Sequence, residues 1–250
     1  MTVRTTKFRS TSRAALRTGL AAAVTVGCAL LVSPPATAGS TPYTDSVAIG
    51  VEAVLAVDTF DTWNSSGKAV DFERFERARD KVATMTAQEM GLSISAVRQQ
   101  FSSTTIAKQR IVLAAMTQLG VPYRSMQSRE GEGFDCSGLT TFAYGETGLE
   151  IPRSSGDQFR AADEQSAEEA QAGDLLYYPG HIGIYLGGDI YVHSRQTGRN
   201  VEVTMVPSRS HSFGDIVPGE VIYPGGLVEE TPGSAMATQP TVAAVTPSAR

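Results

Sequence analysis

Residues 133–139 read Gly133-Phe134-Asp135-Cys136-Ser137-Gly138-Leu139, and this stretch decides the fold because it starts a helix at a cysteine. Asp135 is a favourable N-cap, and apolar residues follow at helical spacing until Gly145. Cys136 then lies in the first turn, where unpaired N–H groups and the helix dipole favour a thiolate. The sequence therefore predicts a nucleophile of lowered pKa beside N–H groups that can bind an oxyanion. Gly138 leaves one side of the turn open, which suits the approach of substrate.

Two of the three histidines, His181 and His193, fall in strand-like runs joined by Gly187-Gly188. A two-residue loop would put His193 opposite Ile182 and the two imidazoles on opposite faces. A three-residue loop with a left-handed glycine instead pairs His193 with Gly183, so that both imidazoles share one face and the aliphatic residues share the other. We predict the second register. His181 is then the general base, and His193 binds its other ring nitrogen and fixes the tautomer.

The same side chains allow simpler interpretations. A lone cysteine is often a small buried hydrophobe, and His193 alone could be an ordinary strand histidine. One cysteine and two histidines could also be zinc ligands, but no Cys-x-x-Cys or closely spaced histidine pair is present. We therefore expect no metal and no cofactor.

The first 38 residues have the pattern of a signal peptide. Five basic residues precede an apolar run from Gly19 to Val32, and Ala36-Thr37-Ala38 is an Ala-x-Ala cleavage site. The run is shorter than the roughly 20 residues of a transmembrane helix. We expect cleavage near Ala38 and a protein that is secreted or held in the cell wall, without stable membrane insertion. Lipidation of Cys28 is an alternative, although Thr25 stands where an aliphatic residue is expected.

Without the leader the chain is strongly acidic. Five of the 21 basic residues precede position 39, which leaves 16 against 26 acidic residues. This balance makes nucleic acids and anionic membranes unfavourable partners. Only Cys136 remains, so the mature chain forms no internal disulfide.

The composition divides the chain into four segments, with a signal peptide at 1–38, a helical region at 39–103, a catalytic domain at 104–224 and a disordered tail at 225–250. The helical region is expected to hold two or three short helices and then one over 95–101, with Gly91 as a stop. Its role, as a scaffold or as an inhibitory cover, stays open.

The catalytic segment is expected to be α+β. Ser103 or Thr104 would cap a helix over Ile106–Leu119. The later runs look like sequential antiparallel strands. They are Asp174–Tyr178, His181–Leu186, Asp189–Ser194, Val201–Val206 and Glu220–Tyr223.

Three blocks together, Phe134–Leu139, Ala172-Gly173-Asp174-Leu175 and His181–Gly187, resemble the NlpC/P60 peptidases over approximately Ile106–Tyr223. The resemblance implies a papain-like core, in which a helix that carries the nucleophile packs on a five- or six-stranded antiparallel sheet. It also implies a Cys-His-polar triad that cleaves bacterial wall peptides, commonly between D-glutamate and a diamino acid. Matched by position, Cys136, His181 and His193 take the triad roles.

The resemblance further assigns Tyr123, Asp135, Ser137 and Arg153 to substrate binding. Each assignment has a structural alternative, such as an N-cap for Asp135, a surface ion pair for Arg153 or an edge of the core for Tyr123. The family's aromatic-Gly-Gly after Tyr123 is replaced by Arg124-Ser125-Met126 and a longer insertion, so the groove there is expected to differ.

These observations predict a secreted cysteine endopeptidase of peptidoglycan stem peptides, acting at the γ-D-glutamyl amide through an acyl-enzyme. An amidase or acyltransferase on the same scaffold is one alternative, because a thiol triad does not determine its acyl group. A non-catalytic wall-binding or regulatory protein with an occluded groove is another.

Overall fold

The computed structural model of the protein describes residues 42–217. The expected signal peptide, the strand at 220–223 and the tail from 225 lie outside this range. The helices are α1 (Val47–Ser66), α2 (Ala69–Met90), α3 (Ile94–Ser102), α4 (Ile106–Met116), α5 (Cys136–Gly145) and α6 (Ser155–Arg160). The strands are β1 (Tyr43–Thr44), β2 (Ser128–Arg129), β3 (Gly133–Phe134), β4 (Asp163–Gln165), β5 (Leu175–Tyr178), β6 (His181–Gly187), β7 (Ile190–Ser194), β8 (Val201–Met205) and β9 (Ser212–Asp215).

The main sheet has the order β1-β8-β7-β6-β5-β9-β4, and every pair in it is antiparallel. The predicted α+β class is confirmed. The sheet has seven strands where five or six were expected, because the short β1 and β4 extend its two edges. Strand β9, at 212–215, was also not expected. The small β2–β3 sheet is formed by the insertion after Tyr123.

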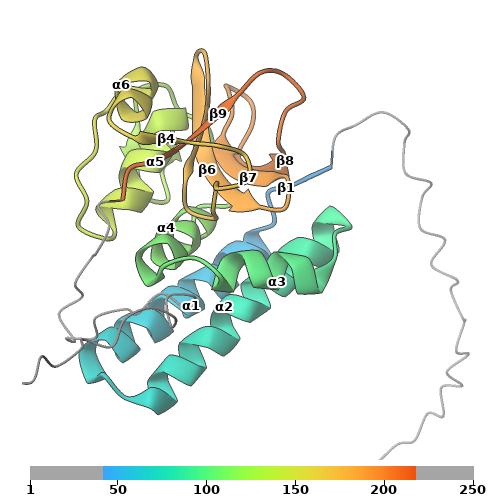
Figure 1. The fold of residues 1–250 in the computed structure, drawn as a ribbon, viewed down its shortest axis with the longest axis vertical. Helices are drawn as coiled ribbons and strands as arrows, with labels where there is room; N and C mark the ends of the chain where they lie inside the picture. Colours follow the sequence, from blue (N-terminus) through green and yellow to red (C-terminus); the bar gives the residue numbers. More distant parts are fainter. Residues whose placement is uncertain (1–41, 218–250) are drawn as a thin grey trace, which may run out of the picture. The chain divides into compact units, whose positions relative to one another are not determined.

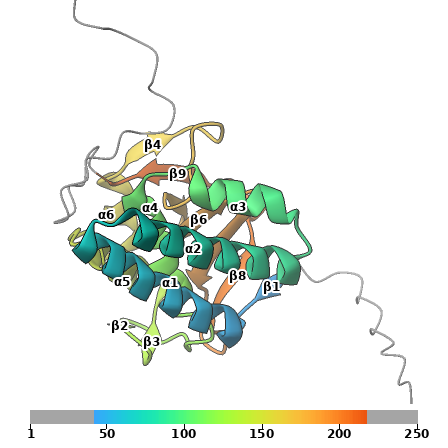
Figure 2. The same ribbon diagram turned by 90° about the horizontal axis from the view of Figure 1, so that it is seen from below.

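Helix α4 is the centre of the packing, and all of its residues are buried. In Figure 1 it lies between the sheet and the α1–α3 layer, and Figure 2 shows α1 and α2 side by side. One hydrophobic cluster includes Ile49 of α1, Phe75 of α2, Ile111 of α4 and Ile184 of β6. The helical region therefore shares its core with the segment that carries the candidate site.

The ends of α2 and α4 can be compared with the capping residues that the sequence predicts. α2 ends before Gly91, whose φ of +68° is left-handed, as predicted. α4 begins at Ile106, as predicted, but the prediction was wrong in its cap and in its last residue. Thr105, rather than Ser103 or Thr104, is its N-cap, since the Thr105 hydroxyl accepts a hydrogen bond from the Lys108 N–H at 3.3 Å, and the helix ends at Met116, before Leu119.

The Ala172–Leu175 block anchors the sheet to α4. Lys108 Nζ lies 2.7 Å from Asp174 Oδ1 and 2.7 Å from Asp215 Oδ2. Gly173 has a φ of +100°, and a Cβ there would lie 2.5 Å from Lys108 Cβ. Only glycine fits between the strand and this buried ion pair, so the block is structural.

The β6–β7 hairpin has the predicted register beside the histidines. Ile184 pairs with Val192 and Tyr185 with Tyr191. The turn is tighter than expected, because Gly187 pairs with Ile190 and a bulge between Tyr185 and Gly187 absorbs the extra residue.

Candidate active site

Cys136 begins α5 and is a half-buried free thiol. Asp135 is the N-cap, as predicted, and its Oδ1 accepts a hydrogen bond from the Gly138 N–H at 2.7 Å. Backbone N–H groups of Ser137 and Ile182 act on the sulfur and lower the pKa of the thiol, but burial is the larger effect and raises it above its ordinary value. The predicted lowering of the Cys136 pKa was therefore wrong in net direction.

The two imidazoles lie together on one face of the sheet. His181 Nε2 is 2.7 Å from His193 Nδ1, and the ring planes are nearly perpendicular at 89°. Gly183 makes the space for them, since a Cβ there would lie 2.8 Å from Val192 O and 3.0 Å from His193 Cβ. Burial, together with the charges of His193 and two arginines, lowers the pKa of His181 to about 3. Burial also lowers the pKa of His193, so both rings are neutral at pH 7.

Cys136 lies beside the start of β6, the strand that begins with His181. The Ile182 N–H acts on the Cys136 sulfur, which places the residue after His181 beside it. Because Nε2 of His181 is engaged with His193, Nδ1 is the ring nitrogen of His181 that is left to accept a proton. Within residues 42–217 no hydrogen bond joins the sulfur to either imidazole in this state.

Sequence reasoning missed a buried carboxylate behind His193. Glu202 pairs with His193 across β7 and β8, its side chain is 1% exposed, and its Oε1 lies 3.5 Å from His193 Nε2. Its other oxygen binds Arg199, whose guanidinium stacks on the Tyr43 ring 4.2 Å from the centroid. The alternation in Val201-Glu202-Val203-Thr204 marks Glu202 as a polar residue on one face. Its contact with His193 can be predicted only when the β7–β8 register is known.

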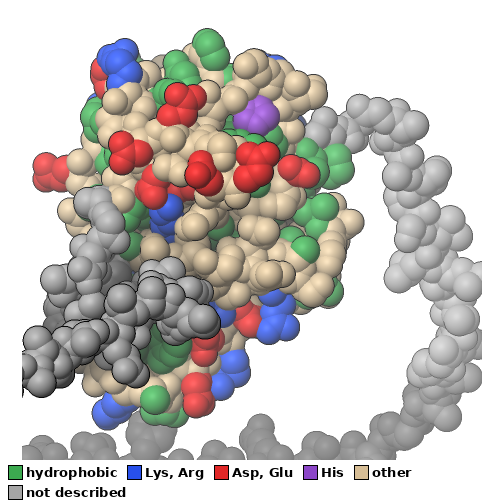
Figure 3. Space-filling model, viewed as in Figure 1, with side chains coloured by type: hydrophobic (Ala, Val, Ile, Leu, Met, Phe, Trp, Pro, Cys, Tyr) green, Lys and Arg blue, Asp and Glu red, His purple; other side chains and the backbone are tan. Residues whose placement is uncertain are grey.

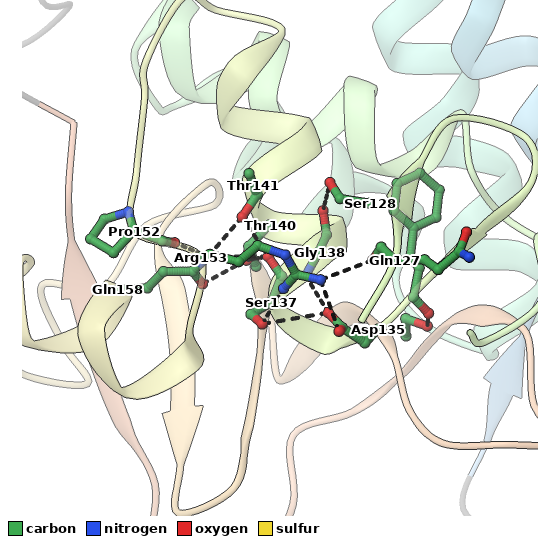
Figure 4. Close-up of polar contacts among 12 residues, drawn as sticks. Gln127, Ser128, Asp135, Ser137, Gly138, Thr140, Thr141, Pro152, Arg153 and Gln158 are labelled. Atoms are coloured by element: carbon green, nitrogen blue, oxygen red, sulfur yellow. Dashed lines mark hydrogen bonds and ion pairs between the residues drawn. The ribbon is translucent and has the colours of Figure 1, made fainter. Parts of the chain in front are cut away.

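Asp135, Ser137 and Arg153, the expected substrate contacts, bind one another (Figure 4). Arg153 Nη2 lies 2.9 Å from Asp135 Oδ2, and Arg153 Nη1 donates to Ser137 Oγ at 2.8 Å. The same guanidinium donates to Gln127 O at 3.2 Å. These contacts fix the start of α5, and substrate binding by the three residues stays a prediction.

Gln158 also binds the first turn of α5. Its amide nitrogen donates to Ser137 O at 3.1 Å and to Pro152 O at 2.8 Å, and its oxygen accepts from Thr140 Oγ1 at 2.7 Å. The side chain is fully buried. α6 and the loop before it therefore hold the first turn of α5, the helix that begins with Cys136, in place (Figure 4).

Tyr123 and Gly138 are two further residues near the thiol. Charges on Cys136 and Asp135 add to burial in raising the pKa of the half-buried Tyr123, which places its ring near both groups. The expectation for Gly138 was wrong. A Cβ there would lie 1.9 Å from Gln127 O, so the protein's own backbone occupies the space that was assigned to substrate.

A cavity of about 810 Å³ opens against both imidazoles. Its walls include Tyr178, the last residue of β5, and two arginines from the loops after β7 and β8, Arg195 and Arg209. A second hollow of about 550 Å³ lies at the insertion, between Pro122 and Glu132. The described residues hold no group of three side chains suited to bind a metal ion, and none of the described helices is long and apolar enough to cross a membrane.

A cysteine at the start of a helix that packs on an antiparallel sheet, with histidines on the sheet, defines a papain-like α+β protein. Residues 120–213 match the NlpC/P60 family. This match confirms the resemblance seen in the sequence.

Three curated relatives share this region. A probable endopeptidase of Corynebacterium glutamicum is 29% identical over 189 residues, which cover 74% of this chain and 87% of that protein. The peptidoglycan endopeptidase RipB of Mycobacterium tuberculosis is 38% identical over 134 residues, covering 47% and 54%. A gamma-D-glutamyl-L-lysine dipeptidyl-peptidase of Bacillus subtilis is 37% identical over 93 residues, covering 34% and 31%. The match thus spans about half of RipB and a third of the Bacillus protein.

The solved structures that are similar include the P60 domain of the antigen MAP1204 from M. avium subspecies paratuberculosis. It is 28% identical, with a TM-score of 0.41, and the alignment covers 45% of this chain and 96% of that domain.

Proposed function

We propose that this protein is a cysteine endopeptidase that hydrolyses peptidoglycan stem peptides at the bond between γ-D-glutamate and a diamino acid. The observation that carries the proposal is the 2.7 Å contact between His181 Nε2 and His193 Nδ1 beside a cysteine at a helix N-terminus. The names of the curated relatives support the substrate class.

In the first step Cys136 attacks the amide carbonyl carbon while its proton passes to Nδ1 of His181. The negative charge that forms on the carbonyl oxygen is stabilised by N–H groups in the first turn of α5. His181 then gives the proton to the departing amine, and a thioester remains on the sulfur. Water hydrolyses the thioester, with His181 now acting as the base.

The positions of the hydrogens on the two imidazoles explain why the mechanism needs both rings and a carboxylate. For Nδ1 of His181 to accept the thiol proton, its Nε2 must carry hydrogen and donate to Nδ1 of His193. His193 must then carry its own hydrogen on Nε2, which faces Glu202 Oε1. The carboxylate therefore favours the one arrangement in which His181 is a base, and Glu202 is a positioning residue.

The protein is proposed to act outside the cytoplasm, since its substrate is there and residues 1–38 have the pattern of an export signal. N-terminal sequencing of the exported protein is expected to give Gly39 as the first residue.

The test is digestion of defined muropeptides, followed by mass spectrometry of the products. We expect cleavage at the γ-D-glutamyl bond by the mature protein, none by Cys136→Ala and a large loss in His181→Gln. His211→Gln is the matched control, because the His211 ring contacts Phe213 and the Arg209 backbone rather than either of the paired imidazoles. Loss of an N-terminal amino sugar from the peptide would point to an amidase, and a new amide product would point to acyl transfer. Binding without turnover would refute the enzymatic proposal.

A further inference from the structure

The cavity against His181 and His193 carries two arginines that form no ion pair with the part of the chain that the structure describes. Arg195 follows β7 and Arg209 follows β8, and both side chains are exposed at the walls of the cavity. Among the arginines of residues 42–217, they are the two whose guanidinium groups take part in no hydrogen bond and no ion pair with the described residues. Arg209 stacks on the Tyr178 ring, 4.7 Å from its centroid.

The surroundings make this pair unusual. The protein carries more acidic than basic residues, and Figure 3 shows acidic side chains gathered on the face that it draws. Yet no aspartate or glutamate lines this cavity within the described part of the chain. The other walls are neutral, and include Gln196, Thr204 and Ser208. Two uncompensated guanidinium groups beside a catalytic imidazole create a local positive potential suited to an anion.

The positive field reaches the imidazole itself. The charges of Arg195 and Arg209 both contribute to the lowered pKa of His181. An anion bound between the two arginines would thus lie close to His181, so that one short peptide could reach both the anion site and the imidazole.

We propose that this cavity is a subsite for a carboxylate of the substrate, bound by Arg195 and Arg209. This rests on the proposed function, because a stem peptide has two carboxylates next to the cleaved bond. One is the α-carboxylate of the γ-linked glutamate, and the other is a carboxylate of the diamino acid. Guanidinium groups suit both, since their paired N–H donors match the two oxygens of a carboxylate.

The experiment uses four synthetic stem peptides, with free carboxylates at both positions, an amide at the glutamate only, an amide at the diamino acid only, or amides at both. For the parent protein, amidation of the bound carboxylate is expected to lower kcat/KM by about tenfold. The position whose amidation has this effect identifies the source of the carboxylate.

The arginines are then tested directly. In the double variant Arg195→Gln/Arg209→Gln, the free-acid peptide is expected to be cleaved about tenfold less efficiently, while the peptide that is amidated at the sensitive position is cleaved at least as well as by the parent. Arg77→Gln, at an exposed position on α2, is the matched control and should keep the full preference. Both variants should melt as the parent does, because these side chains are exposed.

Two results would overturn the subsite and leave the peptidase intact. In one, the parent cleaves all four peptides equally well, and in the other, the double variant keeps the parent's preference. A parent that cleaves none of the peptides would instead refute the proposed function, and the subsite with it.

Discussion

Replacing Glu202 by glutamine removes a negative charge from behind the paired imidazoles and changes little in volume. In the proposed mechanism His181 becomes an imidazolium when it takes the thiol proton. The centroids of the two imidazole rings are 4.9 Å apart, and Glu202 Oε1 is 3.5 Å from His193 Nε2. The positive charge on His181 and the carboxylate are then about 8 Å apart, and at an effective dielectric constant of about 20 they attract by about 2 kcal/mol.

Loss of that attraction in the transition state corresponds to about a 30-fold lower kcat. KM is expected to change little, because Glu202 is buried and touches no substrate. The assay is muropeptide hydrolysis, with Glu164→Gln on the exposed β4 edge as the matched control. A second measurement is ¹⁵N NMR of the imidazoles, in which the Nε2–H tautomer of His193 should lose population in Glu202→Gln.

The reasoning would be refuted by a Glu202→Gln protein that keeps the parent kcat. It would also be refuted by a fall in kcat that is matched by a loss of thermal stability with no change of tautomer. In that second case Glu202 would serve only to neutralise Arg199 and hold β8.

Three further outcomes are expected. Burial raises the pKa of Cys136 and lowers that of His181 to about 3, so the thiol and the imidazole are both neutral without substrate. Alkylation of the thiol by iodoacetamide should therefore be slow at pH 7 and rise only towards pH 9 and above. A plateau of fast alkylation from pH 4 would show a thiolate–imidazolium ion pair instead. Gly183→Ala should lower stability by about 1–3 kcal/mol and reduce kcat, since the new Cβ would lie 2.8 Å from Val192 O, and unchanged melting would contradict this. Arg153→Lys should lower the free energy of unfolding by about 1 kcal/mol and kcat several-fold, because an ammonium group cannot bind the three acceptors of Arg153 in one plane. Parent-like kinetics would show that these three hydrogen bonds are not needed for activity.

The short-range features of the site could be predicted from the sequence. The helix that starts at Cys136, with Asp135 as its cap, follows from local backbone chemistry. The β6–β7 register follows from the alternation of aliphatic and polar residues on either side of two glycines, because only one register buries the aliphatic face. Both predictions depend on residues that are neighbours in sequence.

Long-range features could not be predicted in this way. Glu202 reaches His193 through the β7–β8 pairing, whose register is not fixed by the turn glycine between these strands, Gly198. Tyr43 reaches Arg199 from a strand 156 positions away in the chain. The pKa of Cys136 was predicted from the helix N-terminus alone, whereas burial by the rest of the protein is the larger effect.

The role of the helical region depends on the same long-range packing. Hydrophobic residues of α1 and α2 belong to the cluster that includes α4 and β6, and Arg79 Nη1 donates to Gln109 Oε1 of α4 at 2.9 Å. No residue of the described part of this region lines the cavity at the imidazoles. We infer that the region is a scaffold for α4, rather than a cover of the site.

The neutral resting pair and the two free arginines have a joint consequence for catalysis. Proton transfer from Cys136 to His181 is unfavourable in the empty site, because the thiol is hard to ionise and the imidazole is hard to protonate. The charges of Arg195 and Arg209 are part of the reason why the imidazole is hard to protonate. A substrate carboxylate bound between them would compensate those charges and raise the pKa of His181. The base would then become stronger when substrate is bound, so the thiol would be activated mainly in the presence of the peptide that it cleaves.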